Sequence, residues 1–451
     1  MRRQINWEMI DCNERREKLK NIALEIGSLL KNPQDVKSKI CSEENKIQHK
    51  ELGVEYFPWK DLSLGEGYPG ICLFLGELDR LFPDDGWDEV GHNYMVAIQN
   101  SIHEYGIDSL SLWGGITGIA MAARALSRDG TRYNNFISQL QEIYLENYRA
   151  TLEYSMASLY KGSKVSDYDT ISGWSGIGRY LLFYKDQPAI RKSLEEILSY
   201  LVQLSQDREI NGQIVPGWYV PVENLFLHER EKFPNGYFNC GLSHGIPGPL
   251  ALLALASLHG VEVSGQKEAI HKIAMWLLQW KQVDKYGLYW PNIISWEDHQ
   301  SGVVNLSYHR EAWCYGSPGV ARSIWLAGEA LNDDNFKRIA VEAYLATFHR
   351  PQEKWNIESP TFCHGLIGLV QLTQQMYVDS QREEFKIQRD QLIDRILDMY
   401  EEKAPFRFYD LLGQKKYIKG GLLEGVAGIG IVFSGLISEC TPEWSSVFLI
   451  S

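Results

Sequence analysis

A short glycine pattern, G-x-x-G followed by an apolar run, recurs seven times along the 451 residues and constrains the fold more than any other feature. The first glycines are 48, 58, 72, 71, 49 and 60 residues apart, a spacing typical of a repeat architecture. A residue without a Cβ allows close backbone approach, so we expect each pair at a crowded helix entrance. The pairs are Gly67/Gly70, Gly115/Gly118, Gly173/Gly176, Gly245/Gly248, Gly316/Gly319, Gly365/Gly368 and Gly425/Gly428.

Two kinds of helix are expected to alternate around these glycines. The run after each pair, such as Ile71 to Leu75, is apolar on nearly every side and predicts a buried helix. Charged stretches with a helical period lie between the pairs and suit an outer layer. These stretches include Arg16 to Leu30, Asn134 to Tyr148, Ile190 to Leu204, Gln266 to Trp280, Phe336 to His349 and Phe385 to Tyr400. The alternation predicts an all-α fold, an α/α toroid of seven inner and seven outer helices, in a single domain over residues 1–451.

The two longest intervals flank the fourth repeat and predict a small strand-containing insertion. Their extra residues fall around 206–238 and 283–308, which are rich in aromatic, β-branched, glycine and proline residues. We expect them to form loops with short strands over one rim of the toroid. Long loops at a rim often carry substrate specificity.

Composition excludes several classes of function. The formal net charge is −13 and no Lys/Arg-rich run occurs, so the chain lacks the basic surface that nucleic-acid binding needs. The start, Met1 to Lys20, is highly charged, and the apolar run Pro249 to Leu258 is about half the length of a bilayer span. We therefore expect a cytoplasmic protein, or one bound peripherally at the inner face of the cell membrane. The seven scattered cysteines indicate free thiols or metal ligands.

Equivalent repeats would place the residues directly before the first glycines at one mouth of the ring. Cys314 and Cys363 share one position in neighbouring repeats, and His364 follows Cys363. Two sulfurs and one imidazole nitrogen suit one zinc ion per chain, with the fourth position open as in catalytic sites. The residues before the glycines are Glu66, Gly114, Ser172, His244, Tyr315, His364 and Glu424.

This ligand set favours thiol chemistry. Two thiolates and a neutral imidazole make the zinc centre formally neutral, so a bound thiol loses its proton yet stays electron-rich. His244 should face the same mouth as a general acid or base, although a histidine that only hydrogen-bonds a loop is an alternative. Asp169, Arg310 and Tyr315 lie near the third and fifth glycine pairs, where a helix cap, a surface ion pair and a packed aromatic are equally good interpretations.

Three motifs together resemble the LanC lanthionine cyclases, and the likeness spans nearly the whole chain. The runs Tyr168 to Gly173 and Gly114 to Gly118 resemble further segments of that family. The resemblance implies an α/α toroid with a catalytic zinc, acting in lantibiotic biosynthesis as a stand-alone class I cyclase. The three motifs are Gly241-Leu242-Ser243-His244-Gly245, Trp313-Cys314-Tyr315-Gly316 and Cys363-His364-Gly365.

The resemblance also implies a reaction and partners. A cysteine thiolate of a dehydrated precursor peptide, leader plus core, attacks the β-carbon of dehydroalanine or dehydrobutyrine, and His244 then protonates the α-carbon. Asp169 orients His244 or helps to deprotonate the thiol, while Arg310 and Tyr315 steady the enolate oxygen. A lantibiotic dehydratase and a peptide exporter are the implied partners, in a membrane-associated complex.

Three other interpretations stay open on the sequence. A LanC-like relative with the same zinc motif would add glutathione to dehydroamino acids in proteins. A toroid without catalytic activity would bind peptides or scaffold a membrane-bound complex. An α/α-barrel glycosidase or terpene cyclase would need paired acids in the mouth. Glu66 and Glu424 precede glycine pairs, but helix N-termini favour acids in any case.

Overall fold

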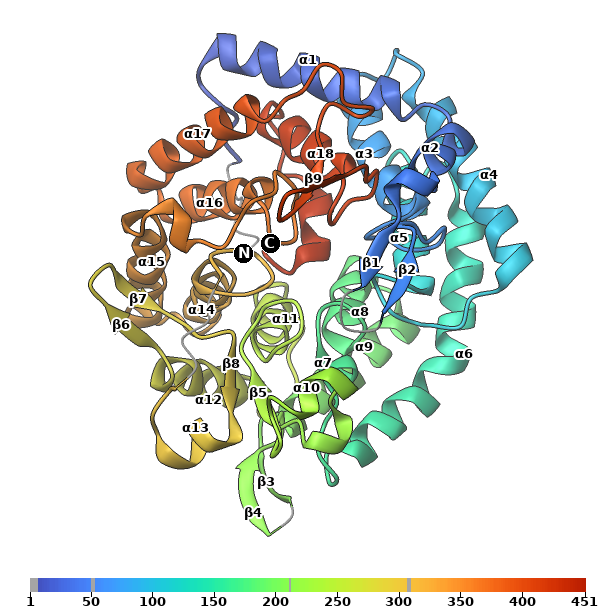
Figure 1. Ribbon diagram of the computed structural model, residues 1–451. Helices are drawn as coiled ribbons and strands as arrows, with labels where there is room; N and C mark the ends of the chain where they lie inside the picture. The colour runs from blue at the N-terminus through green and yellow to red at the C-terminus, as the bar shows by residue number, and fades with distance from the viewer. Residues whose placement is uncertain (1–6, 50–52, 211, 306–309) are drawn as a thin grey trace. The chain divides into compact units, whose positions relative to one another are not determined.

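The computed structural model describes residues 7–49, 53–210, 212–305 and 310–451 (Figure 1). These residues pack into two compact units, which are described separately. The first unit comprises Met1–Glu142 and Ile357–Trp444, and the second comprises Ile143–Asn356 and Ser445–Ser451. Within the described ranges, no helix is both long enough and apolar enough to cross a membrane.

Seven apolar helices begin at the predicted glycines. In six of them the first glycine of the pair directly precedes the helix, and α11 begins two residues after its glycine. Every residue of α18 is buried, as its apolar sequence predicts. The first unit holds α3 (Tyr68–Leu81), α5 (Ile116–Ala125), α16 (Leu366–Ser380) and α18 (Val426–Leu436), and the second holds α8 (Trp174–Leu181), α11 (Pro247–Leu258) and α14 (Ser317–Leu331).

Amphipathic helices form a second layer. The six predicted stretches each fall on one of them, and α4 is a further one that the sequence analysis did not single out. In the two units, α3 packs on α4, α16 on α17, α8 on α9 and α14 on α15. These helices are α1 (Asn13–Leu29), α4 (Trp87–Tyr105), α6 (Asn134–Ser158), α9 (Pro188–Leu204), α12 (Gln266–Gln279), α15 (Asp334–His349) and α17 (Glu383–Asp398).

The strands of the described residues pair in short antiparallel sheets. Six of them lie at the two predicted insertions, and the β5 to β8 pairing joins one insertion to the other. Residues 211 and 306–308 of the insertions lie outside the described residues, and the single domain stays a prediction. The pairs are β1 (Ile47–His49) with β2 (Val54–Tyr56), β3 (Asp207–Ile210) with β4 (Gln213–Pro216), β5 (Tyr237–Asn239) with β8 (Ile293–Ser295), β6 (Gln282–Asp284) with β7 (Gly287–Tyr289), and β9 (Asp410–Leu412) with β10 (Lys415–Tyr417).

Short helical segments complete the described elements. The short α-helices are α2 (Pro33–Ile40), α7 (Val165–Tyr168), α10 (Leu227–Arg230) and α13 (Trp296–Ser301). The 3-10 turns are η1 (Glu43–Asn45), η2 (Leu182–Tyr184), η3 (Val222–Asn224), η4 (Gln352–Lys354) and η5 (Glu443–Phe448). Of these, α7 and α10 bear directly on the site described below.

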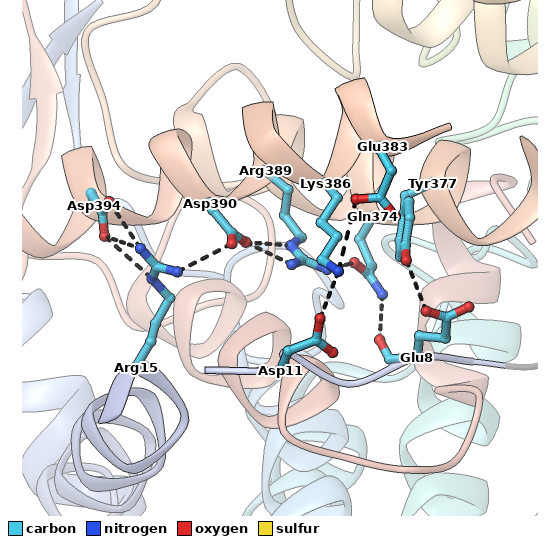
Figure 2. Close-up of polar contacts among 10 residues, drawn as sticks. All are labelled: Glu8, Asp11, Arg15, Gln374, Tyr377, Glu383, Lys386, Arg389, Asp390 and Asp394. Atoms are coloured by element: carbon cyan, nitrogen blue, oxygen red, sulfur yellow. Dashed lines mark hydrogen bonds and ion pairs between the residues drawn. The ribbon is translucent and has the colours of Figure 1, made fainter. Parts of the chain in front are cut away.

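The start of the chain completes the helix layer of the first unit. Helix α1 packs on α18. The first amphipathic helix of the chain therefore covers the last apolar helix. Figure 2 shows the polar contacts that hold this segment along α16 and α17. The guanidinium of Arg15 lies 3.1 Å from Asp390 and 3.0 Å from Asp394, and Gln374 donates a 2.7 Å hydrogen bond to the Glu8 carbonyl. These contacts fix where α1 lies along α17.

In five repeats the second glycine relieves crowding between the apolar helix and its own preceding loop. A Cβ on Gly368 would lie 2.0 Å from the carbonyl oxygen of Phe362, six residues earlier. The predicted close backbone approach is therefore confirmed, and the approaching backbone belongs to the same repeat. The same six-residue relation, with distances of 2.1 to 2.3 Å, holds at Gly70, Gly118, Gly319 and Gly428.

Backbone hydrogen bonds join successive loops of the first unit directly before the apolar helices. The Leu64 N–H donates to the Trp113 carbonyl at 2.9 Å, and the Leu423 N–H donates to the Gly65 carbonyl at 3.0 Å. The Cys363 N–H in turn donates to the Leu423 carbonyl at 2.8 Å. The residues before these glycines therefore share one end of the first unit, as the repeat register predicts.

The glycine packing predicts unequal effects of two alanines in one repeat. Gly118→Ala should lower the free energy of unfolding by about 1–3 kcal/mol through overpacking, because its Cβ would lie 2.1 Å from the Leu112 carbonyl. Gly114→Ala is the control, since a Cβ there meets only Ser111 Oγ at 3.7 Å. Its effect should stay within about 0.5 kcal/mol. Urea unfolding midpoints measure both, and equal losses would contradict this explanation of the glycines.

Candidate active site

Asp169 holds two groups at once at the entrance of α8. It directly follows α7, and only 1% of it is exposed. One carboxylate oxygen accepts hydrogen bonds from the N–H groups of Ser172 and Gly173, both at 2.7 Å. The other oxygen lies 2.6 Å from Nδ1 of His244. The same side chain therefore stabilises the turn before α8 and orients an imidazole.

His244 lies with its imidazole partly exposed to solvent. Its side chain is 41% exposed, so a ligand can reach it. Burial lowers the pKa of His244, but the hydrogen bond and negative charge of Asp169 outweigh that effect, with further contributions from Cys314 and Glu229. The pKa of His244 is therefore raised above its usual 6.5. Because Nδ1 faces Asp169, Nε2 is the ring nitrogen available to a substrate.

The loop that carries His244 is fastened to the loop that carries Cys314. The N–H and the hydroxyl of Ser243 each lie 3.2 Å from the carbonyl oxygen of Cys314. The Ser243 carbonyl in turn accepts a 3.0 Å hydrogen bond from the Thr170 N–H, next to Asp169. The loops before α8, α11 and α14 are therefore joined in series within the second unit, which brings three predicted site residues together.

Tyr315 lies close to His244. The centroids of the two rings are 6.5 Å apart, and the Tyr315 hydroxyl accepts a 3.0 Å hydrogen bond from the Asn239 amide. Burial raises the pKa of Tyr315, so its hydroxyl stays protonated and can act as a donor. A Cβ on Gly241 would lie 2.5 Å from the Tyr315 ring. This contact explains the glycine two residues before Ser243.

Arg310 opens the loop that leads to Cys314. Its carbonyl oxygen would lie 1.3 Å from a Cβ on Gly316, and Gly316 has a φ of +96°. Glycine is therefore required at the entrance of α14 on both steric and conformational grounds. The role of the Arg310 guanidinium stays a prediction.

Cys363 and His364 occupy the loop before α16 in the first unit. The N–H groups of Phe362 and Cys363 donate to the Leu423 carbonyl at 3.1 and 2.8 Å, which fixes the backbone of this loop. The side chains of Cys363 and His364 are both partly exposed. Nε2 of His364 lies 3.8 Å from a carboxylate oxygen of Glu424, the residue before the last glycine pair.

Cys314, Cys363 and His364 form a group of candidate metal ligands. Their two sulfur atoms and one imidazole nitrogen lie within 4.8 Å of one another. All seven cysteines are free of disulfides, so both thiols can ligate. Thiolate sulfur and imidazole nitrogen at such separations suit a tetrahedral zinc ion, whose bonds are about 2.0–2.3 Å long. The chemistry of the donor set fits zinc, and the zinc assignment stays a prediction.

Four polar residues near these groups escaped the sequence analysis: Asn239, Glu229, Lys419 and Asp410. Asn239 lies on β5, and Glu229 on α10 raises the pKa of His244 by its charge. Lys419 and Asp410 form a 2.7 Å ion pair beside the β9 to β10 hairpin. Only Asn239 had a signal in the sequence, because it lies two residues before a glycine of the His244 motif.

Comparison with known proteins assigns a family. NisC of Lactococcus lactis subsp. lactis, a nisin biosynthesis protein, is 29% identical over 395 residues, which cover 84% of this chain and 86% of that protein. A solved structure of nisin cyclase matches with a TM-score of 0.75 at 27% identity, over 86% of this chain and 92% of that one. This match confirms the predicted all-α class, an α/α toroid with small antiparallel sheets. The family profile "Lanthionine synthetase C-like protein" matches residues 58–449, so this chain belongs to the lanthionine synthetase C-like family.

Proposed function

We propose that this protein is a zinc-dependent lanthionine cyclase that closes thioether rings in a dehydrated lantibiotic precursor peptide. The observation that carries the proposal is the group of Cys314, Cys363 and His364, with ligand atoms within 4.8 Å of one another. Its setting in a chain similar to nisin cyclase supports the same conclusion.

Cys314, Cys363 and His364 are the proposed ligands of one zinc ion. Zinc at this site supplies positive charge that lowers the pKa of a peptide cysteine thiol and holds it as a thiolate at neutral pH. The two cysteine ligands offset part of that charge. The donor set therefore favours a sulfur nucleophile over an activated water molecule.

Ring closure needs a general acid that protonates the α-carbon. The peptide sulfur bonds to the β-carbon of dehydroalanine or dehydrobutyrine, and the electron pair of the double bond moves to the α-carbon and carbonyl oxygen as an enolate. His244 donates a proton to the α-carbon through Nε2, and the charge of Asp169, which raises the pKa of His244, favours the protonated ring. The proton lost by the thiol balances the proton gained, so product and substrate have the same mass.

Asp169 acts through His244 in this proposal. Both of its carboxylate oxygens already accept hydrogen bonds, and the residue is 1% exposed, which argues against direct contact with a peptide thiol. Tyr315 and Arg310 are the proposed donors to the enolate oxygen. For Tyr315 the support is its protonated hydroxyl, 3.0 Å from Asn239 at the corner of His244.

The chemistry of the substrate implies one of the proposed partners, and the family resemblance implies the other. Dehydroalanine and dehydrobutyrine arise when serine and threonine lose water, so a lantibiotic dehydratase must act on the precursor first. The proposed partners are this dehydratase and a peptide exporter, in a complex at the cytoplasmic face of the membrane. The substrate carries both leader and core segments.

Thiol counting tests the proposed reaction directly. Incubation of the zinc-loaded protein with a dehydrated, cysteine-bearing precursor should remove the free cysteines, because each ring consumes one thiol. A thiol-alkylating reagent followed by mass spectrometry reports the loss, although the ring itself leaves the mass unchanged. The uncatalysed reaction should be slower and less selective near pH 7, where a free cysteine is mostly protonated.

The same assay separates cyclisation from glutathione addition. Free cysteines that persist in every dehydrated peptide, together with a mass gain from added glutathione, would replace the cyclase by a glutathione-adding enzyme. The catalysed rate should also depend less steeply on pH than the uncatalysed rate between neutral and mildly alkaline conditions.

The His244 and Asp169 pair predicts a shift in titration. In Asp169→Asn the partner charge is lost while burial persists, so the pKa of His244 should fall, as measured by histidine-selective NMR. An acid is active only below its pKa, so cyclisation by this variant should decline at lower pH than in the wild type. His244→Ala should lose about 10²–10⁴ in rate. The exposed His271→Ala is the control, and near-normal cyclisation by His244→Ala would contradict the acid role.

A further inference from the structure

We infer that Glu424, held by the buried Lys419, positions His364 and thereby strengthens zinc binding. The inference rests on the proposed function, because it concerns the same ligand. Its parts all lie in the first unit, on the loops before α16 and α18.

Lys419 is a buried charge that needs an explanation. Its side chain is 8% exposed, and Nζ lies 2.7 Å from Asp410 and 2.5 Å from Glu424. Burial disfavours its charged form, but the two carboxylates more than compensate and raise the pKa of Lys419. An apolar side chain would stabilise such a site as well or better, since desolvation of an ion pair offsets most of its attraction. We therefore assign the Lys419 charge a positioning role.

Asp410 anchors one side of this lysine. Its other oxygen accepts hydrogen bonds from Ser359 at 2.6 Å and from Thr361 at 3.4 Å, on the loop that leads to Cys363. Asp410 is 2% exposed, so its carboxylate is buried between these two hydroxyls and the Lys419 ammonium. Lys419 is therefore held by Asp410, and its second contact, to Glu424, connects that carboxylate to the buried pair.

Glu424 directs its remaining oxygen toward His364. One carboxylate oxygen contacts Lys419, and the other lies 3.8 Å from Nε2 of His364. This distance exceeds a direct hydrogen bond, so the interaction here is electrostatic and a shift of about 1 Å would close it. Glu424 does not belong to the 4.8 Å ligand group, so we treat it as a partner of His364 and not as a metal ligand.

The geometry assigns a role to each nitrogen of His364. A histidine that binds a metal through one ring nitrogen usually donates its other N–H to a carboxylate, which fixes the ring and makes the ligand more basic. With Nε2 facing Glu424, Nδ1 would be the nitrogen left to bind zinc. Loss of such a carboxylate typically weakens metal binding 10-fold to 100-fold.

Glu66 provides a matched control from the same repeat register. It precedes the first glycine pair as Glu424 precedes the last, and the loops of both belong to the first unit. Its carboxylate instead lies 3.4 Å from Lys60, whose side chain is 76% exposed. If an acid before a glycine pair acts only on the stability of its loop, substitutions of Glu66 and Glu424 should have similar effects. If Glu424 supports zinc binding, only its substitution should lower the zinc affinity.

Zinc affinity of the full chain, measured by competition with a chromogenic chelator, tests the inference. Glu424→Gln should bind zinc about 10-fold to 100-fold more weakly than wild type. Glu424→Asp keeps the charge but shortens the side chain, so it should fall between the two. Lys419→Met should also weaken binding, because Glu424 loses its tether. Glu66→Gln should match the wild type.

A zinc affinity of Glu424→Gln equal to that of the wild type would overturn the inference. If the melting temperature of that variant also fell, Glu424, Lys419 and Asp410 would contribute to stability alone. If Glu424→Gln does not fold, Glu424→Asp decides by the same criterion. A wild-type protein that binds no zinc would instead overturn the proposed function, so the two failures are distinguishable.

Discussion

Backbone hydrogen bonds between successive loops are the interaction on which the site depends. In five of the repeats the loop lies against the first turn of its own apolar helix, where a glycine removes the Cβ that would meet the carbonyl six residues earlier. The N–H and carbonyl groups of the loop are then satisfied by the neighbouring loop, as between Cys363 and Leu423 or Ser243 and Cys314. The side chains one or two positions before the glycines are attached to this fixed backbone. A site on a fixed backbone needs little conformational change to bind its ligand.

The apolar helices were largely predictable because their signal is local and repeated. A glycine pair and an apolar run predict a helix start to within two residues, since the crowding arises inside one repeat. Helix α4 was not singled out, although it is as amphipathic as α12, and it contains Gly91. That glycine has a packing reason, since a Cβ there would lie 2.5 Å from the Leu126 side chain. The sequence could not reveal this contact between helices.

The site residues were likewise predictable only where they belong to the repeat pattern. His244 and Cys314 were predictable together, because both depend on the repeat register and their loops are hydrogen-bonded in the second unit. Lys419 and Asp410 were not, because they lie in or directly after the β9 to β10 hairpin, outside the G-x-x-G pattern. Asn239 had only the signal of a nearby glycine, and the β5 to β8 pairing brings it into place. The sequence left two roles for Asp169 as alternatives, a helix cap and a partner of His244. The structure shows both contacts, one to the turn before α8 and one to His244.

X-ray absorption at the zinc edge tests the central claim, that Cys314, Cys363 and His364 hold one zinc ion. The full-length protein should show two sulfur neighbours at about 2.3 Å and nitrogen or oxygen neighbours at about 2.0–2.1 Å. Cys314→Ala and Cys363→Ala should each lose most of the metal, and any residual zinc should show at most one protein sulfur. A zinc shell without sulfur, or full zinc content in both variants, would contradict the account.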